Sequence, residues 1–244
     1  MKQVAAIALL ALSTPVCAGE TIDYFANGIE LEGYVAKAES PRGSVVLIHD
    51  WDGLTEYEKQ RADMLAEQGY SAFVVDLYGK GVRPETPEAN RAETRKLYDD
   101  RETMRELVLA GLAVAEEKGI MNPVMAGYCF GGAVVLEMAR AQPENVPGYA
   151  TFHGGLETPE GQDYSAAKVP VRIYHGGADT NPDMAGFAVF IDELEAAGTP
   201  YKAEVYAGAP HAFTVFGSDR YRADADQQSW ADFLIFLGEV HPGP

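Results

Sequence analysis

The chain has 244 residues and a formal net charge of −18 at pH 7, with 47% hydrophobic and 23% charged residues. This composition is typical of a soluble globular protein with enough apolar residues for a sizeable core. The strong negative charge disfavours binding to nucleic acid or to an anionic lipid surface, so we expect neither a nucleic-acid nor a membrane partner.

The first 18 residues have the pattern of a secretory signal peptide. Lys2 supplies the positive start, residues 4–12 the apolar segment and residues 16–18 a small-residue cleavage site. The apolar segment is short for a membrane span. A lipoprotein would carry its lipid on Cys17, which the bulky preceding valine disfavours. We therefore predict a periplasmic or secreted protein whose mature domain is 19–244.

Strand-like segments recur along the mature chain. Short apolar runs, or apolar and polar residues in strict alternation, predict them. The first of them is expected at an edge of the sheet. The predicted strands are 29–36, 44–50, 72–75, 123–126, 148–152, 169–174 and 201–206.

Helix-like segments lie between these strands. A capping box at Thr55 and Glu58 begins the first helix, and Gly69 ends it. A proline-containing connection leads into one long helical stretch, and further helices are predicted at 131–141, from Pro182 with Asn181 as its cap, and near the C-terminus. Alternating strands and helices predict a single α/β domain, a mainly parallel sheet with helices on both faces.

A lone cysteine lies at a turn between a strand and a helix. Residues 127–131 read Gly-Tyr-Cys-Phe-Gly, which matches the nucleophile elbow G-x-S-x-G with Cys129 in place of serine. Glycines two residues to either side allow the strand and the helix to approach closely. Because the helix N-terminus favours a thiolate, we expect the pKa of Cys129 to lie below the value of about 8.5 for free cysteine. The alternative is a buried structural cysteine.

A nucleophile of this kind needs a histidine base and an acid that orients it. Asp179 follows one late strand and His211 follows the next, in the chain order that this fold uses. His49, His153 and His175 each end a strand and are expected to pack or to line the site.

The acidic residues after the second predicted strand suggest one further kind of site. A metal site built from His49, Asp50 and Asp52 is conceivable, but their spacing matches no usual ligand pattern. We therefore expect neither a metal nor a cofactor.

The mature chain resembles the dienelactone hydrolases, a branch of the α/β-hydrolase fold with a Cys-His-Asp triad. The matching segments are GYCFGG, HGGAD, APHAF, VVDLYGKG and HDWDGL. The resemblance implies Cys129 as nucleophile, His211 as general base and Asp179 as its orienting acid. It also implies an oxyanion hole formed by the backbone amides of Phe130 and Trp51.

The chain departs from the family at two places. Asp50 stands where the family usually has a glutamate that contacts the resting thiol. Of the two arginines that usually bind the substrate carboxylate, the first corresponds to Lys80, and the second falls near Val215, which binds no anion.

The residues expected to line the substrate site are Asp50, Lys80, Tyr128 and His153. Together these features predict a hydrolase that cleaves a small ester or lactone through a thioester on Cys129. The alternative is a non-catalytic ligand-binding or thiol redox-sensing protein on the same fold, and the intact order of nucleophile, acid and histidine argues against it. The sequence predicts neither the natural substrate nor the oligomeric state.

Overall fold

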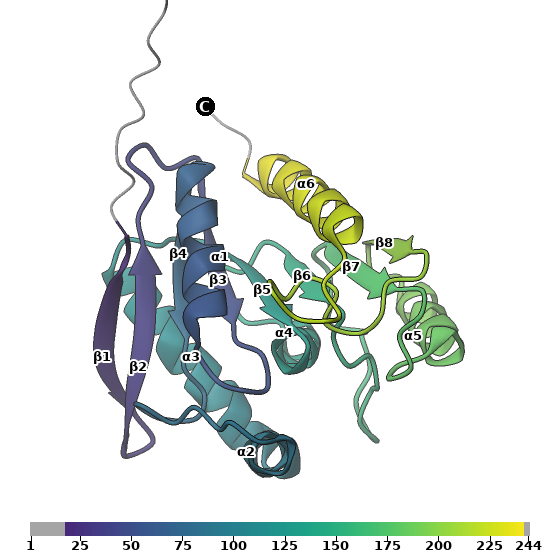
Figure 1. The fold of residues 1–244 in the computed structure, drawn as a ribbon, viewed down its shortest axis with the longest axis horizontal. Coiled ribbons are helices and arrows are strands. Elements are labelled where there is room, and N and C mark those ends of the chain that lie inside the picture. Colours follow the sequence, from purple (N-terminus) through teal and green to yellow (C-terminus); the bar gives the residue numbers. More distant parts are fainter. Residues whose placement is uncertain (1–17, 242–244) are drawn as a thin grey trace, which may run out of the picture.

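The computed structural model describes residues 18–241 (Figure 1). The predicted signal peptide therefore lies almost entirely outside the described residues. The strands are β1 (Glu20–Ala26), β2 (Ile29–Ala36), β3 (Gly43–Ile48), β4 (Tyr70–Val75), β5 (Val124–Tyr128), β6 (Tyr149–Phe152), β7 (Val171–Gly176) and β8 (Tyr201–Tyr206). The helices are α1 (Glu56–Glu67), α2 (Pro87–Asp99), α3 (Arg101–Glu117), α4 (Phe130–Ala141), α5 (Met184–Ala197) and α6 (Ala223–Val240).

The eight strands form one sheet in the order β1-β2-β4-β3-β5-β6-β7-β8. β1 pairs antiparallel with β2, and β2 antiparallel with β4, while every other pair is parallel. The predicted single-domain α/β fold with a mostly parallel sheet is confirmed. The carboxyl ends of the parallel strands lie at one edge of the sheet, where sites form in folds of this kind.

Two buried clusters fill the two faces of the sheet. One contains side chains of α2, α3, α4 and α5, and the other contains side chains of α1 and α6. Successive residues of the central strands alternate between the clusters, as a pleated strand requires. Within residues 18–241, no helix is both long and apolar enough to cross a membrane.

Three details differ from the sequence prediction. The sheet edge is β1, which the sequence analysis missed, and β2 lies one strand inward. The long helical stretch is two helices, because Asp100 leaves the helical conformation and its side chain caps α3 by accepting the Thr103 amide at 3.0 Å. The helix expected at Pro182 begins at Met184 with Asp183 as its N-cap.

Candidate active site

Cys129 lies between β5 and α4 in a strained backbone conformation, with φ 51° and ψ −111°. A positive φ is uncommon for a residue with a Cβ atom and costs conformational energy. The neighbouring glycines make this turn possible. A Cβ atom on Gly127 would lie 2.3 Å from the Gly131 carbonyl oxygen, and one on Gly131 would lie 2.3 Å from that of Ile48. The crowding explains the two glycines of the elbow.

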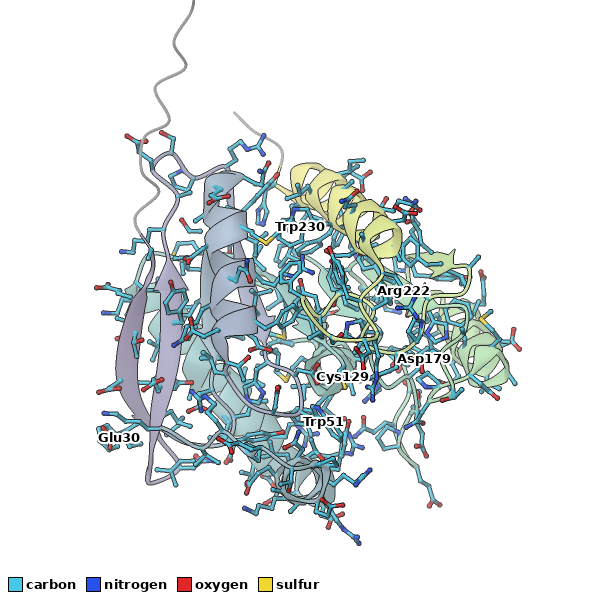
Figure 2. The ribbon with its side chains drawn as sticks, viewed as in Figure 1. Glu30, Trp51, Cys129, Asp179, Arg222 and Trp230 are labelled. Atoms are coloured by element: carbon cyan, nitrogen blue, oxygen red, sulfur yellow. The ribbon has the colours of Figure 1, made fainter. Side chains whose placement is uncertain are left out.

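The structure brings Cys129, His211 and Asp179 together, although they follow three different strands. His211 Nε2 lies 3.0 Å from the Cys129 sulfur, and His211 Nδ1 lies 2.8 Å from Asp179 Oδ2. With its proton on Nδ1, the imidazole donates to the carboxylate and presents Nε2 as an acceptor for the thiol proton. Figure 2 shows Cys129 and Asp179 in the same part of the molecule.

The surroundings of Asp179 favour its ionised form. Burial acts to raise the pKa of this carboxyl, but the hydrogen bonds from His211 and from the Asn181 amide outweigh burial and lower it. The Asn181 amide donates to Asp179 Oδ1 at 2.9 Å. Asn181 therefore belongs to the turn that holds the acid, and Asp183 caps α5.

Asp50 lies on the other side of the thiol, in the loop after β3. The side chain is buried, and its Oδ1 accepts the backbone amide of Trp51 at 2.5 Å. One of the two amides expected to form an oxyanion hole is therefore occupied by a carboxylate. Burial raises the pKa of Asp50, although the hydrogen bonds with the Trp51 amide and with Cys129, and then the charges of His211 and Arg220, act to lower it.

The expectation of a low thiol pKa is wrong. Burial raises the pKa of Cys129 well above its ordinary value, and the charge and hydrogen bond of Asp50 raise it further. The backbone amide of Phe130 acts in the opposite direction but does not compensate. The helix N-terminus is therefore the weaker influence, and the resting group is a thiol.

A third carboxyl, Glu58 in the first turn of α1, supports the Asp50 loop. Its Oε1 accepts the Asp50 amide at 3.2 Å, and its Oε2 accepts the Thr55 amide and hydroxyl, each at 2.8 Å. These bonds complete the predicted capping box. Burial, followed by the charge of Asp52, raises the pKa of Glu58 to about 8.

Cys129 opens into a cavity of about 310 Å³, within the size range of small-molecule sites. Three of its residues project from one face of α2 at spacings of three and four: Arg91, Thr94 and Tyr98. Arg220 lines it from the loop before α6. Among residues 18–241, neither arginine pairs with a carboxylate.

These four cavity residues were not predicted from the sequence. The spacing of Arg91, Thr94 and Tyr98 by three and four residues could have indicated a shared role, because it places them on one face of the helix that follows the β4 loop. No local signal marked Arg220. The predicted residues Asp50, Trp51, Cys129, Phe130 and His211 also line the cavity.

Lys80 does not line the cavity, contrary to expectation. Its ammonium pairs with Asp23 at 2.6 Å and with Glu30 at 2.8 Å, both on the β1–β2 hairpin. Figure 2 shows Glu30 at the edge of the molecule, well away from Cys129. Lys80 follows β4 at the carboxyl end of the sheet, where Cys129 also lies. Its side chain nevertheless points toward the β1–β2 hairpin, because its ion pairs are there, and the first strand of this hairpin was not predicted.

Tyr128 and His153 lie behind the site and do not line the cavity. Strand alternation turns Tyr128 toward the α1–α6 face, where its ring stacks on Phe152 at 4.7 Å. His153 is buried, its Nε2 lies 2.7 Å from Thr214 Oγ1, and its ring meets the His211 ring edge-on at 5.3 Å. Burial lowers the pKa of His153 well below its usual value, so the ring is neutral.

The residues considered for a metal site are engaged otherwise. His49 Nδ1 lies 2.6 Å from the Asp50 carbonyl oxygen, and its Nε2 accepts the Leu77 amide at 3.1 Å. Within residues 18–241, no group of three histidine, cysteine, aspartate or glutamate side chains is arranged to hold a metal ion.

Comparison with known proteins places the chain in a family. The model of the dienelactone hydrolase family matches residues 31–241, which is most of the chain. The chain belongs to the dienelactone hydrolase family. A carboxymethylenebutenolidase of Rhodococcus opacus is 26% identical over 193 residues, covering 72% of this chain and 73% of its own.

Two solved structures resemble the whole dienelactone hydrolase domain. A dienelactone hydrolase-like promiscuous phosphotriesterase from metagenomic libraries has a TM-score of 0.82 and 25% identity, covering 91% of this chain and 98% of its own. A structure named m3DLH has the same TM-score and coverage with 27% identity. This protein is therefore a dienelactone hydrolase-like hydrolase.

Proposed function

We propose that this protein hydrolyses a small ester or lactone that bears a carboxylate, through a thioester acyl-enzyme on Cys129. The observation that carries the proposal is the line from the Cys129 sulfur through His211 to Asp179, with separations of 3.0 and 2.8 Å, in a cavity that contains two unpaired arginines. Family membership supports the hydrolase class.

Acylation begins from a neutral thiol, since burial and Asp50 keep the pKa of Cys129 high. As the sulfur attacks the carbonyl carbon, its proton moves to His211 Nε2, and Asp179 stabilises the imidazolium that forms. The tetrahedral intermediate then expels an alkoxide, which takes the proton from His211 as the thioester forms. With a lactone, the ring opens and the alcohol stays on the acyl group.

The oxyanion hole would use the backbone amides of Phe130 and Trp51. The Trp51 amide donates to Asp50 in the resting site, so the carbonyl oxygen of the substrate has to replace that carboxylate. Asp50 thus engages one of the two oxyanion donors before substrate arrives, and its displacement would also remove a charge that disfavours the thiolate.

Deacylation uses the same groups in reverse order. His211 takes a proton from water, the hydroxide attacks the thioester carbonyl, and the sulfur leaves and regains its proton from His211. The products are the carboxylic acid and the free thiol.

Arg91 and Arg220 are the groups proposed to bind the substrate carboxylate. Both line the cavity and neither is neutralised by an ion pair within residues 18–241, so they can present guanidinium donors to an anion. The net charge of −18 repels anions only at long range, because salt screens charges beyond about 8 Å. The Rhodococcus relative is named a carboxymethylenebutenolidase, an enzyme for a lactone that bears a carboxymethylene group, and such a substrate fits this chemistry.

The reaction is tested with a chromogenic ester and the purified protein. A burst of one equivalent of alcohol, followed by a steady rate, is the expected course. Cys129→Ala should abolish both phases. An undiminished rate in Cys129→Ala, or no hydrolysis of any small ester or lactone by the wild type, would favour the binding or redox-sensing alternative.

Substrate charge is tested with a pair of esters that differ only in a free carboxylate. Arg91→Met and Arg220→Met should each lower kcat/KM for the acidic ester by about tenfold, equivalent to about 1.4 kcal/mol, and leave the neutral ester nearly unchanged. Lys80→Met is the matched control, since that cation lies on the hairpin side. Equal effects on both esters would exclude a carboxylate site.

We also propose that the protein is exported and is periplasmic or secreted. Support comes from residues 1–18 alone, which have the charged start, apolar segment and small-residue cleavage site of a signal peptide. Cell fractionation and N-terminal sequencing of the mature protein test this, with Gly19 as the expected first residue.

A further inference from the structure

One long loop, residues 207–222 between β8 and α6, carries both His211 and Arg220. It contains neither a helix nor a strand. Fixing such a segment costs conformational entropy, so its geometry must come from contacts with the rest of the protein. One of these contacts is made by Arg61 of α1, whose side chain is only 1% exposed.

Arg61 links three parts of the molecule. Its Nη2 donates to the Thr214 carbonyl oxygen at 2.8 Å and to the Asp226 carboxylate on α6. Its Nε donates to the Tyr57 hydroxyl at 3.3 Å. The guanidinium therefore connects α1 and α6 to the middle of the loop.

Aromatic rings enclose the same guanidinium. Its carbon lies 4.2 Å from the ring centroid of Phe216, which is part of the loop, and between 5.3 and 5.6 Å from three further rings. These rings belong to Tyr57, Tyr128 and Trp230. Cation–π attraction at a desolvated site adds to the hold on the loop.

A chain of side-chain contacts leads from Arg61 to the base. The Thr214 hydroxyl lies 2.7 Å from the Tyr57 hydroxyl and 2.7 Å from His153 Nε2. The His153 ring in turn meets the ring of His211 edge-on. Thr214 is thus fixed at its carbonyl and at its hydroxyl, three residues after His211.

Stability alone is a poor explanation for this arrangement. Burying a guanidinium is costly, and apolar residues of similar volume often replace a buried ion pair without loss of stability. Arg61 nevertheless lies among aromatic rings, where an apolar side chain would also fit. Its guanidinium donates a hydrogen bond to Thr214, in the loop that carries His211 and Arg220.

We propose that Arg61 is a positioning residue, which fixes the loop 207–222 so that His211 faces the Cys129 sulfur and Arg220 faces the cavity. This inference rests on the proposed function for its kinetic consequences. Its geometric consequence, the placement of His211 beside the thiol, is testable without hydrolysis.

The informative variant is Arg61→Met combined with Asp226→Asn, because the pair of substitutions removes both charges and leaves no buried carboxylate unpaired. We expect a folded protein whose kcat for a neutral ester falls by about tenfold to a hundredfold while KM changes less, as for a small displacement of a catalytic group. Alkylation of Cys129 by iodoacetamide at neutral pH should slow by about tenfold, and its pH profile should change, because the base no longer faces the thiol.

Arg172→Met is the matched structural control. Arg172 is also buried, pairs with Glu239 and lies over the Phe236 ring at 4.6 Å, but it is near the amino end of β7, away from the site. We expect this variant to lose stability with kcat and the alkylation profile unchanged. Arg61→Lys, which keeps a cation beside Asp226, should recover part of the kcat.

Two results would overturn the proposal. One is a folded Arg61→Met/Asp226→Asn protein with wild-type kcat and an unchanged alkylation profile. The other is an equal loss in the Arg172→Met control. If the wild type hydrolyses no ester, the proposed function fails, and the alkylation rates still decide whether Arg61 positions His211.

Discussion

Two carboxylates of the site have opposite effects in the reaction proposed for the Cys129 thiol. Asp179 acts through His211, which it orients toward the sulfur, and hydrogen bonds keep this carboxylate ionised. Asp50 acts directly, and its charge and hydrogen bond raise the pKa of the thiol while its oxygen occupies the Trp51 amide. In the proposed reaction, one side of the site thus promotes removal of the thiol proton, and the other side retains it.

The difference lies in how far the surrounding hydrogen bonds and charges compensate each carboxylate for its burial. Asp179 has two donors, His211 and the Asn181 amide, so its charge is compensated. Asp50 also has two partners, the Trp51 amide and the Cys129 thiol, but burial outweighs these bonds and raises the pKa of Asp50. A compensated carboxylate can serve a base, whereas a poorly compensated one disfavours any further negative charge beside it.

The largest expected effect comes from Asp179, the carboxylate that is bonded to His211. Asp179→Asn should lower kcat by about 10³- to 10⁴-fold with the fold intact, because an amide no longer holds the imidazole with its proton on Nδ1. Steady-state kinetics and circular dichroism measure the two quantities. Asp183→Asn, which preserves the N-cap of α5, is the control and should retain full activity. A loss of less than tenfold in Asp179→Asn would leave the acid without a role.

The next largest effect concerns Glu58, which accepts the Asp50 amide and so supports the loop that carries Asp50. Its pKa is raised from 4.5 to about 8, so between these values the folded state binds a proton that the unfolded state has released. Stability from this group is therefore fully present below about pH 4.5 and is lost as the pH rises toward 8, by about 1.4 kcal/mol per pH unit.

Urea unfolding at pH 5, 6.5 and 8 tests this linkage. In Glu58→Gln the decline in unfolding free energy with pH should be shallower by about that slope, since a carboxamide does not titrate. Glu56→Gln, in the same turn but exposed, controls for the loss of a negative charge at the helix N-terminus. Parallel pH profiles of Glu58→Gln and the wild type would contradict the assignment.

A smaller effect is expected from removing the negative charge of Asp50, which raises the pKa of the Cys129 thiol. Asp50→Asn should speed alkylation of Cys129 at pH 7 by about tenfold, which corresponds to lowering the thiol pKa by about one unit. Asp52→Asn is the matched comparison and should have a lesser effect, because Asp52 is the weakest of the named influences on this pKa. An unchanged rate in Asp50→Asn would mean that burial alone keeps the thiol protonated.

The smallest effect concerns the cap that supports Glu58. Thr55→Ala removes the hydroxyl that accepts the Tyr57 amide and donates to Glu58, and should lower the unfolding free energy by about 1 kcal/mol. Thr55→Ser should retain most of that stability. If Thr55→Ala and Thr55→Ser unfold alike, the hydroxyl contributes nothing.

The sequence was sufficient for the features that follow from chain order and local spacing. The elbow at Cys129 needs glycines at fixed distances, and parallel strands bring the ends of distant segments to one edge, so the approach of Asp179 and His211 could be predicted. Strand alternation also predicts that Tyr128 points to the α1–α6 face. We instead expected it to line the cavity, because it precedes Cys129 in the sequence.

The remainder of the site depends on packing that no local pattern encodes. The position of Lys80 is decided by Asp23 and Glu30 on a hairpin, and that of Arg220 by how the loop before α6 folds. The pKa of Cys129 depends on desolvation and on the distance to Asp50, neither of which spacing reveals.

The cavity wall formed by α2 contributes Arg91, Thr94 and Tyr98, but none of the atoms proposed to react. The helix is bounded by Thr86 and Asp100, and both residues cap helices. It is therefore a separate helix that lines the cavity without supplying a reacting group. A one-residue insertion before it would rotate its inward face by about 100° and replace all three side chains at once. Substrate preference in such an enzyme can diverge through this one segment while the chemistry is inherited unaltered.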